Sequence, residues 1–223
     1  MSLNRPILAV YGGTFDPFHR GHAAVCNRVL AEPDVAQLRL IPCSIPVLKD
    51  GATANAEHRL RMLEQWQQAS PFRARIEVDG QELQRLGPSY TADTIASLIT
   101  QWPAHKIVFV LGSDAWNSLP LWHRFEQLAS EISFWVFSRS GSDPIEYHQA
   151  LTACSTQQDF LNAQAGHFWI EQGVQIPLSS SELRQTDDFE NWPVPLVVQN
   201  YITEHNLYRK SAGLDKSERI NDR

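Results

Sequence analysis

Apolar stretches alternate with amphipathic ones along most of the chain. Short runs rich in apolar and β-branched side chains predict strands at 7–11, 37–42, 75–78, 106–111, 133–137 and 168–171. Apolar side chains at helical spacing predict helices over 21–31, from the cap Asn55 through Trp66, over 91–101 and over 195–205. The run at 106–111 is the strongest strand, and strands and helices follow one another in turn.

This alternation predicts an α/β fold, a Rossmann-like doubly wound parallel sheet in a single domain with helices on both faces. Ligands of such sheets bind beyond the carboxyl ends of the strands. We therefore expect the functional site to be lined by the loops after Tyr11, Pro42, Leu111 and Phe137.

Composition excludes several classes of protein. Of the 223 residues, 43% are hydrophobic, and 19 basic against 25 acidic side chains give a net charge of −6. Binding of nucleic acid through a general basic surface is therefore not expected. No window approaches the ~20 apolar residues of a membrane span, and Arg5 and Pro6 stand where a signal peptide would begin its apolar run. We expect a cytoplasmic protein without membrane contact.

Cysteine usage and the end of the chain add two expectations. Cys26, Cys43 and Cys154 are odd in number, widely spaced and without a CxxC pair, so neither a disulfide framework nor a zinc site is predicted. We expect one domain over residues 1–208 and a disordered tail over 209–223, because that last segment is highly charged and almost devoid of apolar side chains.

The most informative segment joins the first strand to the first helix and reads YGGTFDPFHRGH over residues 11–22. Gly12 and Gly13 allow a ligand to approach the backbone closely, and the N–H groups at the start of the helix attract anions. His19 and His22 lie three residues apart and are expected to face the same anion. The structural alternative is a tight glycine turn with one capping and one exposed histidine. A metal pair lacks an identifiable third ligand.

A second segment, LSSSELR over residues 178–184, combines hydroxyl groups with an arginine. Ser179 and Glu182 have the S-x-x-E spacing of a capping box, so a purely structural role is one alternative. Helix-terminal N–H groups, serine hydroxyls and the fork of Arg184 are also the donors that a triphosphate needs. A cap and a phosphate site can coincide here.

A third segment follows the strongest strand. Gly112, Ser113 and Asp114 begin it, and Trp116 and Trp122 follow. The structural alternative is a helix cap at Ser113 or Asp114 with both tryptophans in the core, which is the usual location of this side chain.

Together these segments resemble a known family. Residues 12–22 resemble the GGTFDPxHxGH signature of the HxGH nucleotidyltransferases, and among them the bacterial nicotinate mononucleotide adenylyltransferases. Residues 178–184 resemble the family's ISSTxxR motif, and residues 112–124 its G-[AS]-D and W-h-r segments. Residues 88–91, alone only a turn and an N-cap, resemble a segment near the pyridine nucleotide, and 201–208 resemble the C-terminal helix. The resemblance covers nearly the whole domain.

The resemblance implies transfer of AMP from ATP to nicotinate mononucleotide, which forms deamido-NAD and pyrophosphate in NAD biosynthesis. The attacking phosphate is already anionic at neutral pH, so positioning and charge neutralisation suffice. The implied catalytic residues are His19, His22 and Arg184. The implied ATP-binding residues are Gly12, Gly13, Thr14, Asp114, Arg139, Ser180 and Ser181. The implied mononucleotide-binding residues are Lys49, Tyr90, Thr91 and Trp122.

Within this interpretation Asp114 orients ribose and Trp122 stacks on the nicotinate ring. Mg²⁺ bound with ATP bridges phosphate oxygens, and no dedicated metal ligands of the protein are implied. The two histidines, Lys49 and Arg184 act with magnesium as local cations in a chain of net charge −6.

One segment departs from the family pattern. Where the family has a loop close to PNxxPPHK, residues 42–49 read PCSIPVLK, so the asparagine and the histidine are absent and Lys49 is kept. This departure leaves nicotinamide mononucleotide or another phosphate as alternative acceptors. A nucleotide-binding sensor without catalysis is the rival from a different class. We still expect preference for the acid, because backbone N–H groups near Tyr90 and Trp122 are implied to receive its carboxylate.

Overall fold

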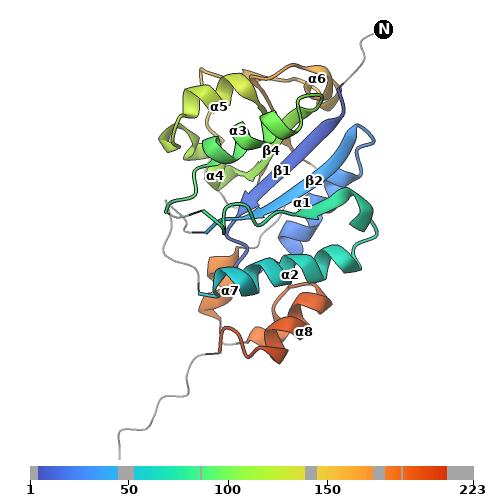
Figure 1. Ribbon diagram of the computed structural model, residues 1–223, viewed down its shortest axis with the longest axis vertical. Coiled ribbons are helices and arrows are strands. Elements are labelled where there is room, and N and C mark those ends of the chain that lie inside the picture. Colours follow the sequence, from blue (N-terminus) through green and yellow to red (C-terminus); the bar gives the residue numbers. More distant parts are fainter. Residues whose placement is uncertain are drawn as a thin grey trace, which may run out of the picture.

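The computed structural model describes residues 5–44, 53–85, 87–138, 145–172, 179–186 and 188–209. At its centre is a sheet of seven parallel strands in the order β3-β2-β1-β4-β5-β7-β6 (Figure 1). The strands are β1 (Ile7–Gly13), β2 (Val35–Pro42), β3 (Ile76–Val78), β4 (Lys106–Gly112), β5 (Ser133–Phe137), β6 (Thr152–Ala153) and β7 (His167–Glu171). The predicted doubly wound parallel sheet is confirmed.

Helices cover both faces of the sheet, with α3 and α5 on one side and α2 and α8 on the other (Figure 1). The α-helices are α1 (Arg20–Leu30), α2 (Ala56–Ala69), α3 (Thr91–Gln101), α4 (Ser113–Asn117), α5 (Phe125–Glu131), α6 (Gln157–Asn162), α7 (Ser180–Gln185) and α8 (Leu196–Glu204). Short 3₁₀ turns lie at Arg73–Arg75, Leu119–Leu121 and Phe189–Asn191. No helix in these described ranges is long and apolar enough to cross a membrane.

Successive residues of the central strands belong to two different cores. Ile7, Ala9 and Tyr11 of β1 pack in the cluster that includes α1, α2 and α8. Leu8 and Val10 pack in the cluster that includes α3, α4 and α5. Because side chains alternate across a strand, a strand buried on both faces needs an unbroken apolar run. This is the reason that the β1 and β4 sequences are continuous in apolar residues.

Three parts of the chain differ from the sequence expectations. β1 extends through Gly12 and Gly13, whose partners are Ile41 and Pro42 of β2, so the glycines belong to the strand. Helix α5 was not predicted, because its N-cap, Arg124, provides no side-chain cap. The motif-free segment 143–165 contributes β6 and α6 from its described part. Of the expected tail, residues 210–223 lie outside the described residues.

The sheet order reverses at β1. Strand β2 lies on one side of β1 and β4 on the other, so crossover connections leave in opposite directions. A crevice forms at the carboxyl ends of strands at such a switch point. Gly13 is paired with Pro42, and Gly112 is paired with Phe137, so the four loops expected to line the site begin at one edge of the sheet.

Candidate functional site

The glycine pair is required by packing. A Cβ atom on Gly12 would lie 3.1 Å from the Phe109 ring, and one on Gly13 would lie 3.1 Å from the Phe15 ring. Both rings are buried, so neither can move aside easily. The interpretation that Gly12 and Gly13 form a tight turn is therefore wrong. The two positions need glycine because aromatic rings pack against the strand there, which the sequence did not reveal.

Phe15 fixes the course of the loop after β1. Its φ of 51° lies in the left-handed region, which costs a non-glycine residue roughly 1–2 kcal/mol. The ring meets Tyr11 edge-on with centroids 5.4 Å apart and lies 5.9 Å from the ring of Phe18. This aromatic packing holds the turn in place, and the turn directs the following Asp16 into the protein, where it is fully buried.

His19 and His22 form a reciprocal cap at the start of α1. The Nδ1 atom of His19, the N-cap residue, accepts from the backbone N–H of His22 at 3.3 Å. The Nδ1 atom of His22 accepts from the backbone N–H of His19 at 3.2 Å. The two rings are stacked with centroids 3.7 Å apart. Both histidines therefore have a capping role, where the structural alternative assigned one, and they also lie together as the anion-site interpretation expects.

The hydrogen bonds of this cap determine which ring nitrogen of each histidine carries the proton. An Nδ1 atom that accepts a hydrogen bond carries no proton, so each neutral ring is protonated at Nε2. A second proton would break the cap and bring two positive charges into stacked rings. The geometry thus favours two neutral rings that carry their proton on Nε2, and the role of His19 and His22 as local cations stays a prediction.

Asp16 connects three distant parts of the chain. Its carboxylate accepts from the backbone N–H groups of Thr53 at 2.6 Å and Ala54 at 3.1 Å, and from the hydroxyl of Tyr208 at 2.6 Å. Arg184 lies 3.5 Å from the same carboxylate. Burial raises the pKa of the Tyr208 hydroxyl, and the negative Asp16 raises it further, so the hydroxyl keeps its proton and donates. The sequence showed no sign of the role of Tyr208.

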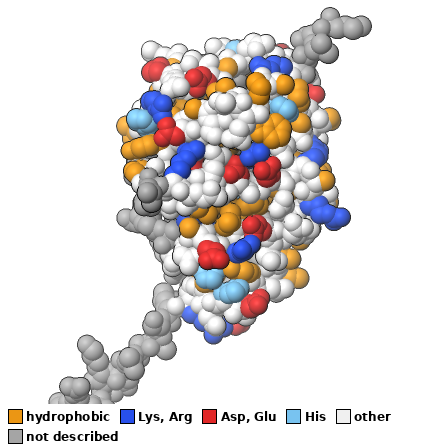
Figure 2. All heavy atoms as spheres, in the orientation of Figure 1, with side chains coloured by type: hydrophobic (Ala, Val, Ile, Leu, Met, Phe, Trp, Pro, Cys, Tyr) orange, Lys and Arg blue, Asp and Glu red, His pale blue; other side chains and the backbone are white. Residues whose placement is uncertain are grey.

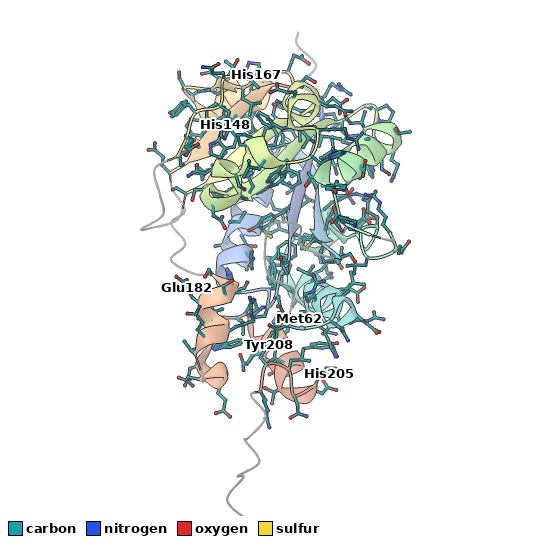
Figure 3. All side chains as sticks on the ribbon, turned by 90° about the vertical axis from the view of Figure 1, so that its left-hand side faces the viewer. Met62, His148, His167, Glu182, His205 and Tyr208 are labelled. Carbon is teal, nitrogen blue, oxygen red and sulfur yellow. The ribbon has the colours of Figure 1, made fainter. Side chains whose placement is uncertain are left out.

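Helix α7 joins this loop through two side chains. The Ser180 hydroxyl donates to the backbone oxygen of Pro17 at 3.0 Å, and the Arg184 guanidinium donates to the backbone oxygen of Asp16. The predicted capping box is confirmed, because the Ser179 hydroxyl accepts from the backbone N–H of Glu182 and Glu182 accepts from that of Ser179. Figure 3 shows Glu182 and Tyr208 well away from His148 and His167, which lie at the other end of the molecule.

The two tryptophans after β4 have different surroundings. Trp116 is fully buried, and its indole N–H donates to the backbone oxygen of Glu146 at 2.6 Å, which fits the core alternative. Trp122 is half-buried and meets Phe109 edge-on with centroids 5.8 Å apart. Asp114 is exposed in the first turn of α4, directly after the carboxyl end of β4.

Aromatic rings continue beside Trp122. Tyr90, the N-cap residue of α3, lies against His123 with ring centroids 4.5 Å apart, and Thr91 begins the helix. An ion pair between Arg124 and Asp93 joins the same two segments. The structure therefore brings Tyr90, Thr91 and Trp122 to one half of the edge, and His19, His22, Ser180, Ser181 and Arg184 to the other.

Cys43 and Ser44 lie between these halves. The Cys43 backbone N–H donates to Gly13 at 3.0 Å, and its thiol lies 3.6 Å from the Thr14 hydroxyl. Burial raises the pKa of this thiol, so it stays protonated at neutral pH. The Ser44 N–H donates to the Ser89 hydroxyl at 3.1 Å, next to Tyr90.

Two predicted site residues are not placed. Lys49 and Arg139 lie outside the described residues. Within the described ranges no three His, Cys, Asp or Glu side chains converge as a metal site. Figure 2 shows acidic and basic side chains interspersed on the face in view, which agrees with the expectation that no general basic surface exists there.

Comparisons with known proteins agree on one family. The Cytidylyltransferase-like family model matches residues 10–186. A probable nicotinate-nucleotide adenylyltransferase of Marinomonas sp. is 33% identical over 91% of this chain and 94% of its own. One from Oceanobacillus iheyensis is 32% identical over 90% of this chain and 96% of its own.

Solved structures support the fold. Plasmodium falciparum nicotinic acid mononucleotide adenylyltransferase complexed with NaAD superposes with a TM-score of 0.69 over 91% of this chain and 97% of that one, at 20% identity. The sequence relatives cover most of the chain at 30% identity or more, and they carry the family assignment. The chain therefore belongs to the Cytidylyltransferase-like nucleotidyltransferases and, within them, to the nicotinate-nucleotide adenylyltransferase family.

Proposed function

We propose that this protein transfers the adenylyl group of ATP to the phosphate of nicotinate mononucleotide, giving nicotinate adenine dinucleotide and pyrophosphate. The observation that carries the proposal is the reciprocal cap of His19 and His22 at the switch point of the sheet. It places two stacked imidazole rings beside the N-terminus of an eleven-residue helix, which is a favourable place for phosphate.

The reaction needs no protein nucleophile. An oxygen of the mononucleotide phosphate forms a bond to the α-phosphorus of ATP, and the bond from that phosphorus to the β-phosphate oxygen breaks. The leaving pyrophosphate takes the electron pair, and the attacking phosphate is already an anion at neutral pH. Catalysis then depends on alignment and on stabilising the charge that moves to pyrophosphate.

We call the half of the carboxyl edge that carries His19, His22 and Arg184 the phosphate half. It would supply hydrogen-bond donors for the charge that moves to pyrophosphate. The Nε2–H groups of His19 and His22 would donate to the α- and β-phosphates. Ser180, Ser181 and Arg184 would hold the β- and γ-phosphates, and Gly12, Gly13 and Thr14 would form the floor of the site. Asp114 would accept from ribose hydroxyls, and Arg139 would complete the nucleotide site.

The aromatic half suits a pyridine nucleotide. Trp122 would stack on the pyridine ring, while the backbone near Tyr90 and Thr91 would donate to the nicotinate carboxylate. Lys49 would approach the mononucleotide phosphate. Ser44 contacts Ser89 beside this half, and the altered sequence that begins at Cys43 is the observation that favours nicotinamide mononucleotide as a second candidate acceptor.

Nucleotidyltransferases of this kind generally use a divalent metal with ATP. The buried Asp16 carboxylate is already bonded to two backbone N–H groups and to Tyr208, so it is not available as a metal ligand. With Asp16 engaged in this way, the site fits a Mg²⁺ ion that would be held mainly by phosphate oxygens and water. When bound there, magnesium neutralises charge on the phosphates.

The deciding experiment incubates the protein with ATP, magnesium and either nicotinate or nicotinamide mononucleotide. Pyrophosphate release and chromatography of the dinucleotide are measured, with an acceptor-free control. We expect turnover with nicotinate mononucleotide above that with the amide. Higher turnover with the amide would support the second candidate. ATP binding without pyrophosphate release with either acceptor would identify a sensor.

A further inference from the structure

Arg59 is a fully buried cation that the proposed reaction does not use. It lies in the first turn of α2 and is 1% exposed, although arginine is almost never fully buried unless its charge is paired. Its Nη1 donates to the backbone oxygens of Thr14 and Cys43, both at 2.8 Å. Its Nη2 donates to that of Ser44 and its Nε to that of Ala54, both at 3.3 Å.

These carbonyls come from three separate segments at the carboxyl edge of the sheet. Thr14 follows β1, Cys43 and Ser44 follow β2, and Ala54 precedes α2. Ala54 is also held through its N–H by the Asp16 carboxylate at 3.1 Å. One guanidinium therefore holds the loop after β1 against the segment after β2 and the residue before α2. We call this loop, residues 14–19, the phosphate-half loop. Lysine cannot reproduce the planar fork of donors that makes these contacts.

The buried Asp16 carboxylate contacts the N–H of the same Ala54 whose backbone oxygen accepts from Arg59, without a direct bond between the two charges among the described contacts. No carboxylate in the described part of the chain forms an ion pair with it. Its field reaches the edge, because it lowers the pKa of Cys43 and of Tyr208 against the larger effect of burial. Arg59 contacts the backbone oxygen of Thr14. A buried cation at this position attracts an anion bound beside Thr14 more strongly than a solvent-exposed cation at the same distance would.

We propose that Arg59 is a positioning residue for the triphosphate, which holds the Thr14 backbone in place and adds fixed positive charge behind it without touching substrate. The inference rests on the proposed function only in placing the ATP phosphates against residues 12–14.

The chain provides a matched control at the opposite edge of the sheet. Arg75 donates to the backbone oxygens of Leu30 at 2.9 Å, Glu32 at 3.1 Å and Val35. It is thus a guanidinium bonded to three carbonyls, like Arg59, but it lies at the amino ends of β2 and β3. Loss of either fork leaves carbonyls unpaired, and only loss of Arg59 affects the candidate site.

The test compares Arg59→Lys, Arg59→Gln and Arg75→Lys. Melting temperature, KM for ATP and for nicotinate mononucleotide, and calorimetric binding of ATP with magnesium are measured at a temperature where all variants are folded. We expect Arg59→Lys to weaken ATP about tenfold through loss of the fork, and Arg59→Gln to weaken it further because the charge is also lost. KM for the mononucleotide changes less than threefold in both, and Arg75→Lys lowers only the melting temperature.

ATP affinity in Arg59→Lys within twofold of wild type would overturn the proposal. So would equal losses for both substrates, or an ATP affinity in Arg59→Gln equal to that in Arg59→Lys. If wild-type protein binds ATP but shows no turnover, the proposed function fails while the binding comparison still decides the role of Arg59.

If neither substitution at residue 59 folds, NMR of wild-type protein labelled with ¹⁵N-arginine decides. The Nε–H of Arg59 is recognised as the slowest arginine group to exchange, because it is fully buried. Inorganic pyrophosphate with magnesium is then expected to shift its resonance and leave that of Arg75 in place. An unshifted Arg59 resonance would overturn the proposal.

Discussion

The two edges of the parallel sheet carry similar basic side chains in opposite surroundings. At the carboxyl edge lie the N-termini of α1, α3, α4 and α7, and the positive ends of these helix dipoles make the edge attractive to anions. At the amino edge α3, α5 and α6 end, so carbonyl oxygens gather there. The same doubly wound topology produces both edges.

A cavity of about 290 Å³ lies at the amino edge, lined in part by Trp102, His105, Lys106 and Glu131. Lys106 donates to the backbone oxygen of Phe160 at 2.5 Å, and Arg5 donates to that of Ala104 at 3.2 Å. These cations satisfy carbonyls. Burial lowers the pKa of Lys106 to about 8, and burial together with the nearby Arg5 lowers that of His105. From this comparison we expect a phosphate to bind where positive helix ends gather, whatever the size of the cavity at the other edge.

The largest expected effect concerns His22. His22→Asn can keep the cap on the His19 N–H but loses the Nε2–H donor, so kcat should fall roughly a hundredfold or more, as for removal of one transition-state donor worth about 3 kcal/mol. His22→Ala should lose the same activity and about 1 kcal/mol of stability with the cap. Turnover and thermal unfolding are the measurements.

His167→Ala makes the same chemical change at the amino edge, where we expect activity to stay within twofold of wild type. A folded His22→Asn variant that turns over within a few-fold of wild type would remove the contrast between the edges.

The next effect concerns Arg184, which contacts Asp16 and Ser181 in this structure. Arg184→Ala should raise KM for ATP about tenfold or more, because a charged fork to phosphate is lost, with much less change for the mononucleotide. Arg184→Lys should restore only part of it. Steady-state kinetics with each substrate varied checks this. Equal losses for both substrates would contradict the assignment.

A smaller effect is expected in the half of the carboxyl edge that contains Tyr90 and Trp122, and it concerns KM for the mononucleotide. Trp122→Ala should raise KM for nicotinate and nicotinamide mononucleotide alike by about two- to tenfold, since stacking does not depend on the carboxylate. Trp102→Ala, at the amino edge, should leave both values unchanged. In wild type, kcat/KM should favour the acid, because the amide brings an NH₂ group against N–H donors. An amide value at or above the acid value would point to the segment after Pro42 as the cause.

The smallest effect belongs to the amino edge and concerns stability alone. The folded-state pKa of Lys106 is lowered to about 8, so the unfolded chain binds more protons above that pH. Stability should therefore rise with pH between about 8 and 10.5 by an amount on the order of 1 kcal/mol. Lys106→Met should remove this slope without changing kcat, as followed by urea unfolding at several pH values. A persistent slope would assign the effect to another group.

Much of the fold was readable because its signals are local. The apolar run at 106–111, the cap at Asn55 and the periodicity of 91–101 match β4, α2 and α3 closely. Helix α5 was missed because it has only seven residues and because its N-cap residue is Arg124, whose φ is 56° and whose side chain makes no cap. The insertion of β7 between β5 and β6 is decided by pairing at long range, which no window of sequence contains.

The candidate site, like the fold, has features that follow from local sequence and features that depend on residues distant in the sequence. The capping box at Ser179 and the closeness of His19 to His22 follow from spacing on a helix. Arg59 and Tyr208 carry no such signal, because their partners are backbone groups and a carboxylate distant in the sequence. A full charge in the first turn of α2 looks like an ordinary surface arginine until the fold buries it. The roles of the site residues stay predictions until the variants are measured.

The hydrogen bond from Tyr208 to Asp16 joins residues 192 positions apart, and this sets a timetable for synthesis. At about 5–20 residues per second, the ribosome needs roughly 10 to 40 s to travel from one to the other. During that interval the nascent chain can assemble β1, β2 and β4, but the loop beside them lacks a partner for its buried carboxylate. The core cluster that includes α1 and α2 also includes Val198 and Ile202 of α8, so the core and the loop that holds Asp16 are both completed only when the last part of the domain has been synthesised.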